Sequence, residues 1–288
     1  MTLENFIPEI WAAEVQRALE KNLVYGQAGI ANRDYEGEIS AQGDAVRINQ
    51  IGPVTVKSYA KNTDIDSPET LTDAQQVLQI TEQDYFNFQI DDIDKAQQKP
   101  KVMQAAMAEA SYAMRDSVDQ FIASLYTDVS ASNLKGTDAV PITPNNTAGD
   151  AQNIYNIIVD CGVLLDDSRC PLEGRWMIVP PWFYGRLLKE DRFVSTEKAG
   201  TSAGLRNGQV GMVDNFTILR SHNVPNTAST KYKILFGTAQ GITFANQINK
   251  VEAFRPERRF ADAVKGLNTY GAKVTRPQCV GVMTCNSS

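Results

Sequence analysis

Hydrophobic positions recur every three or four residues in several stretches of the chain, which is the spacing of one face of an α-helix. Residues 7–25 predict an amphipathic helix, and Pro8 suits its first turn. The clearest pattern covers residues 100–128, where neither Gly nor Pro follows Pro100, and it predicts a helix of roughly 42 Å. Two more helices are expected at about residues 150–166 and 182–188.

From residue 43 the period changes to two, which indicates β-strands. Residues 43–56 predict a strand that bends at Gly52-Pro53, and a second extended run covers residues 77–90. We expect the two runs to form one long two-stranded hairpin with a polar tip. Further strands are expected near residues 176–179, 216–219, 234–236 and 242–244, and a mobile Gly/Ser/Thr loop over 195–208. Because strands and helices follow one another without a βαβ rhythm, the predicted fold class is α+β.

Composition restricts the class of protein. The chain has 288 residues, enough for one large or two ordinary domains, and its net charge of −6 argues against a protein that mainly grips nucleic-acid phosphates. No run approaches the roughly 18 to 20 apolar residues of a membrane span, so no membrane partner is expected. The first residues carry no signal-peptide pattern, and we expect folding in a cytoplasm.

Residues that carry catalytic or metal chemistry are scarce. Cys161, Cys170, Cys279 and Cys285 match no common zinc spacing and are expected to be reduced, as buried apolar residues or surface bystanders. A disulfide stays open, although the pattern does not support one. The single histidine, His222, has no recognisable catalytic partner motif. We assign no catalytic, cofactor-binding or metal-binding residues and expect a protein that is not an enzyme. A hydrolase that uses two carboxylates is disfavoured but stays open.

Charge is distributed unevenly. Residues 61–100 hold nine Asp/Glu and three Lys, a local −6, whereas residues 250–288 hold seven Lys/Arg and three acids, a local +4. These segments are either two solvated faces or surfaces that attract each other. The hairpin favours the second interpretation, because a two-stranded ribbon is marginally stable in water and cannot bury two apolar faces alone. The pattern indicates a plate-like subunit that overlaps its neighbours.

The order of these elements resembles the major capsid proteins of tailed bacteriophages, which have the Hong Kong 97-type fold. Two stretches resemble the coat-protein branch of short-tailed phages, namely Gly208–Phe216 leading to Val224-Pro225, and Tyr270–Val282. The resemblance implies an N-terminal arm (1–42), an extended β-hairpin loop (43–92), a peripheral domain (93–149) with the spine helix 100–128, an axial domain (150–225) and return strands with the C-terminus (226–288).

The resemblance also implies a function. Copies would form pentamers and hexamers through the region 170–210 and build an icosahedral phage head around double-stranded DNA, which they would touch weakly and without sequence preference. Portal and scaffolding proteins are the other expected partners, and the virion, assembled in the host cytoplasm, is the expected location. Candidate intersubunit contacts are Lys57, Tyr59, Lys61, Asp64, Asp66, Arg255, Arg258 and Arg259.

Some relatives join a loop lysine to a neighbour's asparagine, and Lys57 and Lys61 lie in the corresponding element, although no matching motif surrounds them. Two other functions stay open. One is an encapsulin-like nanocompartment shell, which resembles the same fold but encloses enzymes. The other is an α+β hydrolase or sugar-binding domain, which would be a monomer or small oligomer.

Overall fold

The computed structural model describes residues 23–34, 45–51, 73–91, 102–147, 149–190, 212–257 and 260–287, together with positions 56, 58–59, 61–62, 64 and 67. Almost all of the predicted helix over 7–25 and the whole loop over 195–208 lie outside these residues. The same holds for four candidate contact residues, Lys57, Asp66, Arg258 and Arg259.

The long predicted helix is α3 (Val102–Ser124), followed by the 3₁₀ turn η2 (Leu125–Asp128). One side of α3 carries the buried residues Met114, Val118 and Ile122, in agreement with the apolar spacing. The α-helix ends four residues before the predicted position. The Ser124 hydroxyl donates to the Phe121 carbonyl at 2.6 Å, and such a bond competes with continued helix and favours a tighter turn.

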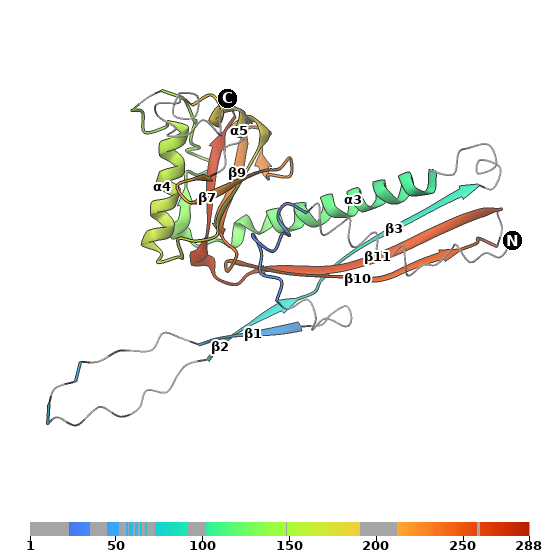
Figure 1. Ribbon diagram of the computed structural model, residues 1–288, viewed down its shortest axis with the longest axis horizontal. Helices are drawn as coiled ribbons and strands as arrows, with labels where there is room; N and C mark the ends of the chain where they lie inside the picture. The colour runs from blue at the N-terminus through green and yellow to red at the C-terminus, as the bar shows by residue number, and fades with distance from the viewer. Residues whose placement is uncertain are drawn as a thin grey trace.

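A three-stranded antiparallel sheet lies beside α3, in the order β10 (Ile242–Phe254), β11 (Ala261–Val274), β3 (Glu82–Asp91). Figure 1 shows α3 running along one side of this elongated sheet. Tyr270 of β11 joins the two layers, because its ring packs edge-on against Phe121 of α3 at 5.4 Å and its hydroxyl donates to Asp84 of β3 at 2.8 Å.

The hairpin consists of β1 (Ala45–Ile51) and β2 (Asp73–Gln79), which pair antiparallel. The prediction of one return strand over residues 77–90 is wrong. The run divides at Ile80, and its second half is β3, which pairs with β11 and not with β1. The period-two alternation continues across the division because each strand has one face that is more buried than the other. Such alternation does not show which strand is the pairing partner.

The hairpin crosses the sheet on the face opposite α3 (Figure 1). Ile48, Leu78 and Ile80 form a small buried cluster there with Ala245 of β10. Gly271 of β11 lets the chain pass closely, since a Cβ at this position would stand 2.6 Å from the Gln79 carbonyl oxygen. The Lys273 ammonium donates to the Val77 carbonyl at 2.9 Å and adds a second tie.

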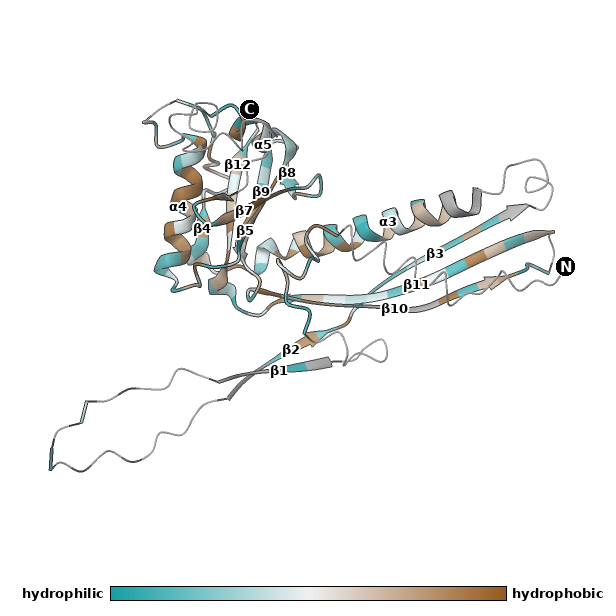
Figure 2. Cartoon of the chain, in the orientation of Figure 1, coloured by the Kyte–Doolittle hydropathy of each residue, from teal (hydrophilic) through white to brown (hydrophobic). Residues whose placement is uncertain are grey.

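A separate, compact body is built on a mixed sheet of seven strands in the order β4-β12-β9-β5-β7-β6, with β8 paired to β9. The strands are β4 (Leu134–Lys135), β5 (Arg175–Val179), β6 (Met212–Val213), β7 (Phe216–Arg220), β8 (Asn226–Thr227), β9 (Lys231–Thr238) and β12 (Val280–Asn286). All five residues of β5 are buried, which fits its central place. Figure 2 shows hydrophobic residues gathered in this body, whereas hydrophobic and polar residues alternate along the strands of the long sheet.

Helices α4 (Ile154–Asp167) and α5 (Pro181–Leu187) belong to the compact body, close to the predicted positions 150–166 and 182–188. Asn153 sets the start of α4, because its side-chain oxygen accepts the backbone N–H of Tyr155 at 3.0 Å. Two more short 3₁₀ segments in the described residues, η3 (Ala131–Asn133) and η4 (Pro277–Cys279), lie where the two bodies join. The α+β class is confirmed.

Candidate subunit interface

The hairpin beyond β1 and β2 presents exposed side chains at every described position. Val56 is 93% exposed and Tyr59 is 70% exposed, and Lys61 and Asp64 are exposed as well. Exposed apolar and aromatic side chains on a projecting element are typical of a contact surface. Three predicted contact residues, Tyr59, Lys61 and Asp64, therefore lie where another molecule could reach them.

The long sheet has a second open surface, which we call the outer face. Successive side chains of a strand point to opposite faces of the sheet. Tyr270 of β11 faces α3, so Leu267, three positions earlier on the same strand, points away from α3. Tyr85 of β3 stands opposite Leu267 and is 78% exposed. A hollow of about 360 Å³ lies here. Its lining consists of Tyr85, Phe86, Asn87, Glu252, Lys265, Gly266 and Leu267.

Basic residues of the C-terminal segment are partly neutralised within their own hairpin. Arg255, a predicted contact residue, is exposed and its Nε lies 3.1 Å from Oδ1 of Asp262. The Lys265 ammonium lies 2.8 Å from Glu252 and 5.4 Å from the centre of the Phe254 ring. Phe260, which directly precedes β11, is 84% exposed. The tip of the sheet thus combines paired charge with exposed aromatic surface.

The acidic and basic segments do meet, but within one chain. Strand β3 runs along β11, with Glu82 opposite Tyr270 and Asp91 opposite Ala261. These acids stand opposite uncharged residues, and Lys265 stands opposite Asn87, so the pairing of β3 with β11 brings no acid directly opposite a base.

An anchor that the sequence reasoning missed holds residues 23–26. Asp119 of α3 is 2% exposed, and its two carboxylate oxygens accept the backbone N–H groups of Val24 at 2.9 Å and Tyr25 at 3.0 Å. Burial raises the pKa of this carboxyl to about 6, against the lowering effect of these N–H groups and of nearby Arg115. The sequence held one sign of this anchor, namely a charged residue, Asp119, directly after Val118 of the apolar stripe of the predicted helix.

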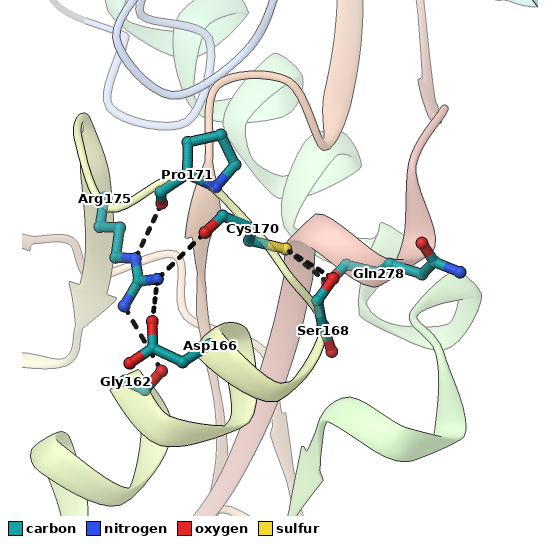
Figure 3. A network of polar contacts seen from close by, with 7 residues as sticks. All are labelled: Gly162, Asp166, Ser168, Cys170, Pro171, Arg175 and Gln278. Atoms are coloured by element: carbon teal, nitrogen blue, oxygen red, sulfur yellow. Dashed lines mark hydrogen bonds and ion pairs between the residues drawn. The ribbon is translucent and has the colours of Figure 1, made fainter. Parts of the chain in front are cut away.

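A second missed anchor is Arg175, whose side chain is 1% exposed. As Figure 3 shows, its guanidinium donates to Asp166 and to the carbonyl oxygens of Pro171, Cys170 and Gly162. The planar fork fits these acceptors, so each of the three guanidinium nitrogens donates at least one hydrogen bond. It fixes the loop after α4 against β5.

The first of the two stretches that carried the resemblance has a structural explanation where it is described. Asp214 (φ 49°) and Asn215 (φ 63°) form the two-residue turn between β6 and β7, a conformation that Asp and Asn tolerate. The Asp214 carboxylate lies so close to Gly162 of α4 that any Cβ there would collide with it. The described part of the stretch, residues 212–216, therefore shapes the compact body.

Residues with catalytic or metal potential do not gather in the described part of the chain. His222 is exposed, and no group of three His, Cys, Asp or Glu side chains stands close enough to hold a metal ion there. All four cysteines are buried and none is in a disulfide, which confirms the prediction of buried apolar residues. No described helix is long and apolar enough to cross a membrane.

Together, the long helix on a three-stranded sheet, the projecting hairpin and the separate mixed sheet define a coat protein of the Hong Kong 97 type. Residues 75–282 match the family model described as phage capsid protein, and the chain belongs to this family. It is a structural major capsid protein. A search of curated proteins found no match to the sequence.

Several solved structures are similar. The one titled "Mycobacterium phage Che8" has 26% identity and a TM-score of 0.72 over 91% of each chain. The capsid of Ralstonia phage GP4 has 12% identity and a TM-score of 0.68, covering 92% of this chain and 88% of that one. The encapsulin complex from Synechococcus elongatus is more distant, with 12% identity and a TM-score of 0.52 over 87% and 85%. The predicted capsid family and fold are confirmed, whereas the domain limits and contact residues stay predictions.

Proposed function

We propose that copies of this chain assemble into pentamers and hexamers that close into an icosahedral phage head around double-stranded DNA. The observation that carries the proposal is that one subunit has two surfaces with exposed apolar or aromatic side chains. The hairpin ends in exposed Val56 and Tyr59, and the outer face of the sheet offers exposed Tyr85 beside a hollow. The hairpin of one copy would lie on the outer face of the next.

Such a contact joins two different surfaces, so it repeats from copy to copy and closes into a ring when the rotation allows. The compact body, with the region 170–210, would line the centre of each ring. Apolar area supplies most of the association energy, at about 25 cal/mol per Å² removed from water.

Charge would guide assembly more than hold it. Exposed ion pairs are worth about 0–1 kcal/mol and are screened by salt. Arg255 is already paired with Asp262 of its own chain, which leaves Lys57, Lys61, Asp64, Asp66, Arg258 and Arg259 as the candidates for contacts between copies.

The remaining roles follow from membership in the capsid family. The chain would act without enzymatic activity, assemble in the host cytoplasm and meet portal and scaffolding proteins. It would touch packaged DNA weakly, as expected for its net charge of −6. A covalent link from Lys57 or Lys61 to an asparagine of a neighbour is a further proposal, which a denaturing gel showing only monomer would refute.

Electron microscopy of the expressed full-length chain tests the proposal. Closed particles with five- and six-fold units that enclose nucleic acid in infected cells are the expected result. Particles that enclose an enzyme would favour the encapsulin alternative, and a monodisperse monomer at high concentration would refute both. Assembly should also slow between low and high salt; equal rates would remove the role given to charge.

A further inference from the structure

Two of the four cysteines meet where the two bodies of the subunit join. Cys170 lies in the loop between α4 and β5, and Cys279 is the last residue of η4, just before β12. The Cys170 thiol lies 3.0 Å from the Gln278 carbonyl oxygen, which belongs to the peptide bond leading into Cys279 (Figure 3). The Cys279 side chain is close enough to that of Cys170 to contribute to the raised pKa of the Cys170 thiol. The fold thus places Cys170 next to the chain segment of Cys279, although the two residues are more than 100 positions apart in sequence.

The backbone on both sides of this pair is fixed by a dense set of hydrogen bonds. Buried Asn133 donates from its amide to the carbonyl oxygens of Gln278 at 2.6 Å and Val280 at 3.0 Å. Its side-chain oxygen accepts the Ser168 hydroxyl at 2.7 Å. Arg175 donates to the Cys170 carbonyl at 3.3 Å. Both cysteines are therefore held in place by partners that do not involve sulfur.

We propose that Cys170 and Cys279 form a reversible disulfide within one subunit when the chain leaves a reducing cytoplasm for oxidising surroundings. The oxidant is a small disulfide such as oxidised glutathione. One protein thiolate attacks it and releases one reduced thiol, and the second protein thiolate then attacks the mixed disulfide and releases another. Two S–H groups are oxidised to one S–S bond, and the small disulfide is reduced to two thiols.

Local chemistry makes this reaction slow and selective. Burial raises the pKa of the Cys170 thiol to about 12; the neighbouring Cys279 thiol and the negative charge of Asp166 add to the increase, and the positive charge of Arg175 opposes it. Little thiolate is present at neutral pH in the folded subunit, so oxidation of the pair is slow. Cys170 and Cys279 nevertheless retain 7% and 8% exposure, which gives a reagent access.

The other two cysteines provide an internal control. Cys161 and Cys285 have no exposed surface, and burial raises the pKa of both thiols. The Cys161 thiol contacts the Met283 sulfur at 3.8 Å, inside the apolar core. A small disulfide in water cannot reach this pair in the folded chain.

A bond between Cys170 and Cys279 would close a long loop and tie the start of β12 to the loop that follows α4. Closing a loop of this length restricts the unfolded chain strongly. We expect the oxidised subunit to melt several degrees higher than the reduced one. The timing of oxidation rests on the proposed function, because it assumes that the subunit leaves the cell as part of a phage particle. The chemistry does not depend on shell formation.

The test treats the native full-length chain with oxidised glutathione at a pH of about 8, where thiolates become more common. Intact mass, a count of free thiols and non-reducing peptide mapping follow the reaction. The expected result is the loss of two hydrogens, two remaining free thiols, one peptide pair joined through Cys170 and Cys279, and full reversal by dithiothreitol. Cys170→Ser and Cys279→Ser should abolish the change, and Cys161→Ala should retain it.

Four free thiols after prolonged oxidation would overturn the proposal, and so would a bond between any other pair. If a serine variant does not fold, the peptide map of the unmodified chain still decides the matter. The test runs on dissociated subunits as well as on particles, so its failure is distinguishable from a failure to assemble.

Discussion

At the scale of single residues, buried polar side chains in this subunit hold chain segments in place through hydrogen bonds, which supply the direction that apolar packing lacks. Asp119 accepts two backbone N–H groups of residues 24 and 25, Arg175 binds three carbonyl oxygens, and Asn133 joins Ser168 to η4. Each of these groups has hydrogen-bond partners, as buried polar groups require. They set the positions from which the larger elements depart.

Asp119 makes stability depend on pH. Its pKa of about 6 in the folded chain exceeds the ordinary value of 3.8, so the folded state binds more protons between these values. Stability from this group is therefore fully present below about pH 4 and is lost as pH rises through about 6. The full change is at most about 3 kcal/mol, since one pKa unit corresponds to about 1.4 kcal/mol. Arg115 and Tyr25 are the other titratable groups that face it.

The measurement compares denaturant unfolding of the unmodified chain and Asp119→Asn from pH 4 to pH 7. The asparagine variant should be less stable throughout, by about 1–3 kcal/mol, because its NH₂ replaces one of the two acceptor oxygens. Its deficit should shrink as pH rises. Glu109→Gln, an exposed change on the same helix, controls for the loss of one charge. A deficit that is constant with pH would contradict the account.

At the scale of elements, the sequence predicts those that fold by local periodicity. Helices α3 and α4 and strands β5, β7 and β9 lie close to their expected positions because each has a repeating apolar face of its own. The division between β2 and β3 was missed because pairing partners lie far away, at β1 and β11. The same distance in sequence hid the Asp119 and Arg175 anchors, whose partners are backbone groups without a side-chain pattern.

The candidate interface was predicted in part. Exposed Tyr59, Lys61 and Asp64 follow from the polar and aromatic composition of the hairpin, whereas the hollow beside Tyr85 depends on the register of β3 against β11. Arg255 was proposed as a contact residue, but its pairing with Asp262 needed the turn between β10 and β11 to be known. Long-range register is the information that a single sequence lacks.

The crossing of the hairpin over β11 depends on Gly271. In Gly271→Ala the new methyl group would stand 2.6 Å from the Gln79 carbonyl oxygen and 3.0 Å from Ile80, so β2 must move away. We expect a loss of about 1–3 kcal/mol and faster hydrogen exchange of the β2 amides, with α4 unaffected. Gly185→Ala in α5 is the matched control, because no atom lies within 4 Å of its new Cβ and alanine favours a helix. Unchanged exchange in β2 would refute this role.

At the scale of the whole molecule, the subunit separates folding from association. The compact body and the junction bury their own apolar residues, and 35 buried apolar residues of the described part of the chain form one cluster there. The described strands of the hairpin contribute the small buried cluster of Ile48, Leu78 and Ile80 with Ala245, and its described positions beyond these strands, such as Val56 and Tyr59, are exposed. Changes near the hairpin tip should therefore alter assembly while leaving the subunit stable.

The double variant Val56→Ser with Tyr59→Ser tests this separation. Both side chains are exposed in the subunit, by 93% and 70%, so their loss should leave the melting temperature of the dissociated subunit unchanged. If they are covered by a neighbouring copy, the same changes remove apolar burial once per contact, and the loss repeats over the entire shell. The yield of closed particles per mass of soluble chain, measured by sedimentation and electron microscopy, should fall at least severalfold.

Tyr112→Ser on α3, which removes an aromatic ring that is 54% exposed, should keep the original yield. Particles at full yield from the double variant would show that the hairpin tip lies uncovered in the shell, and the overlap of hairpin and outer face would have to be abandoned.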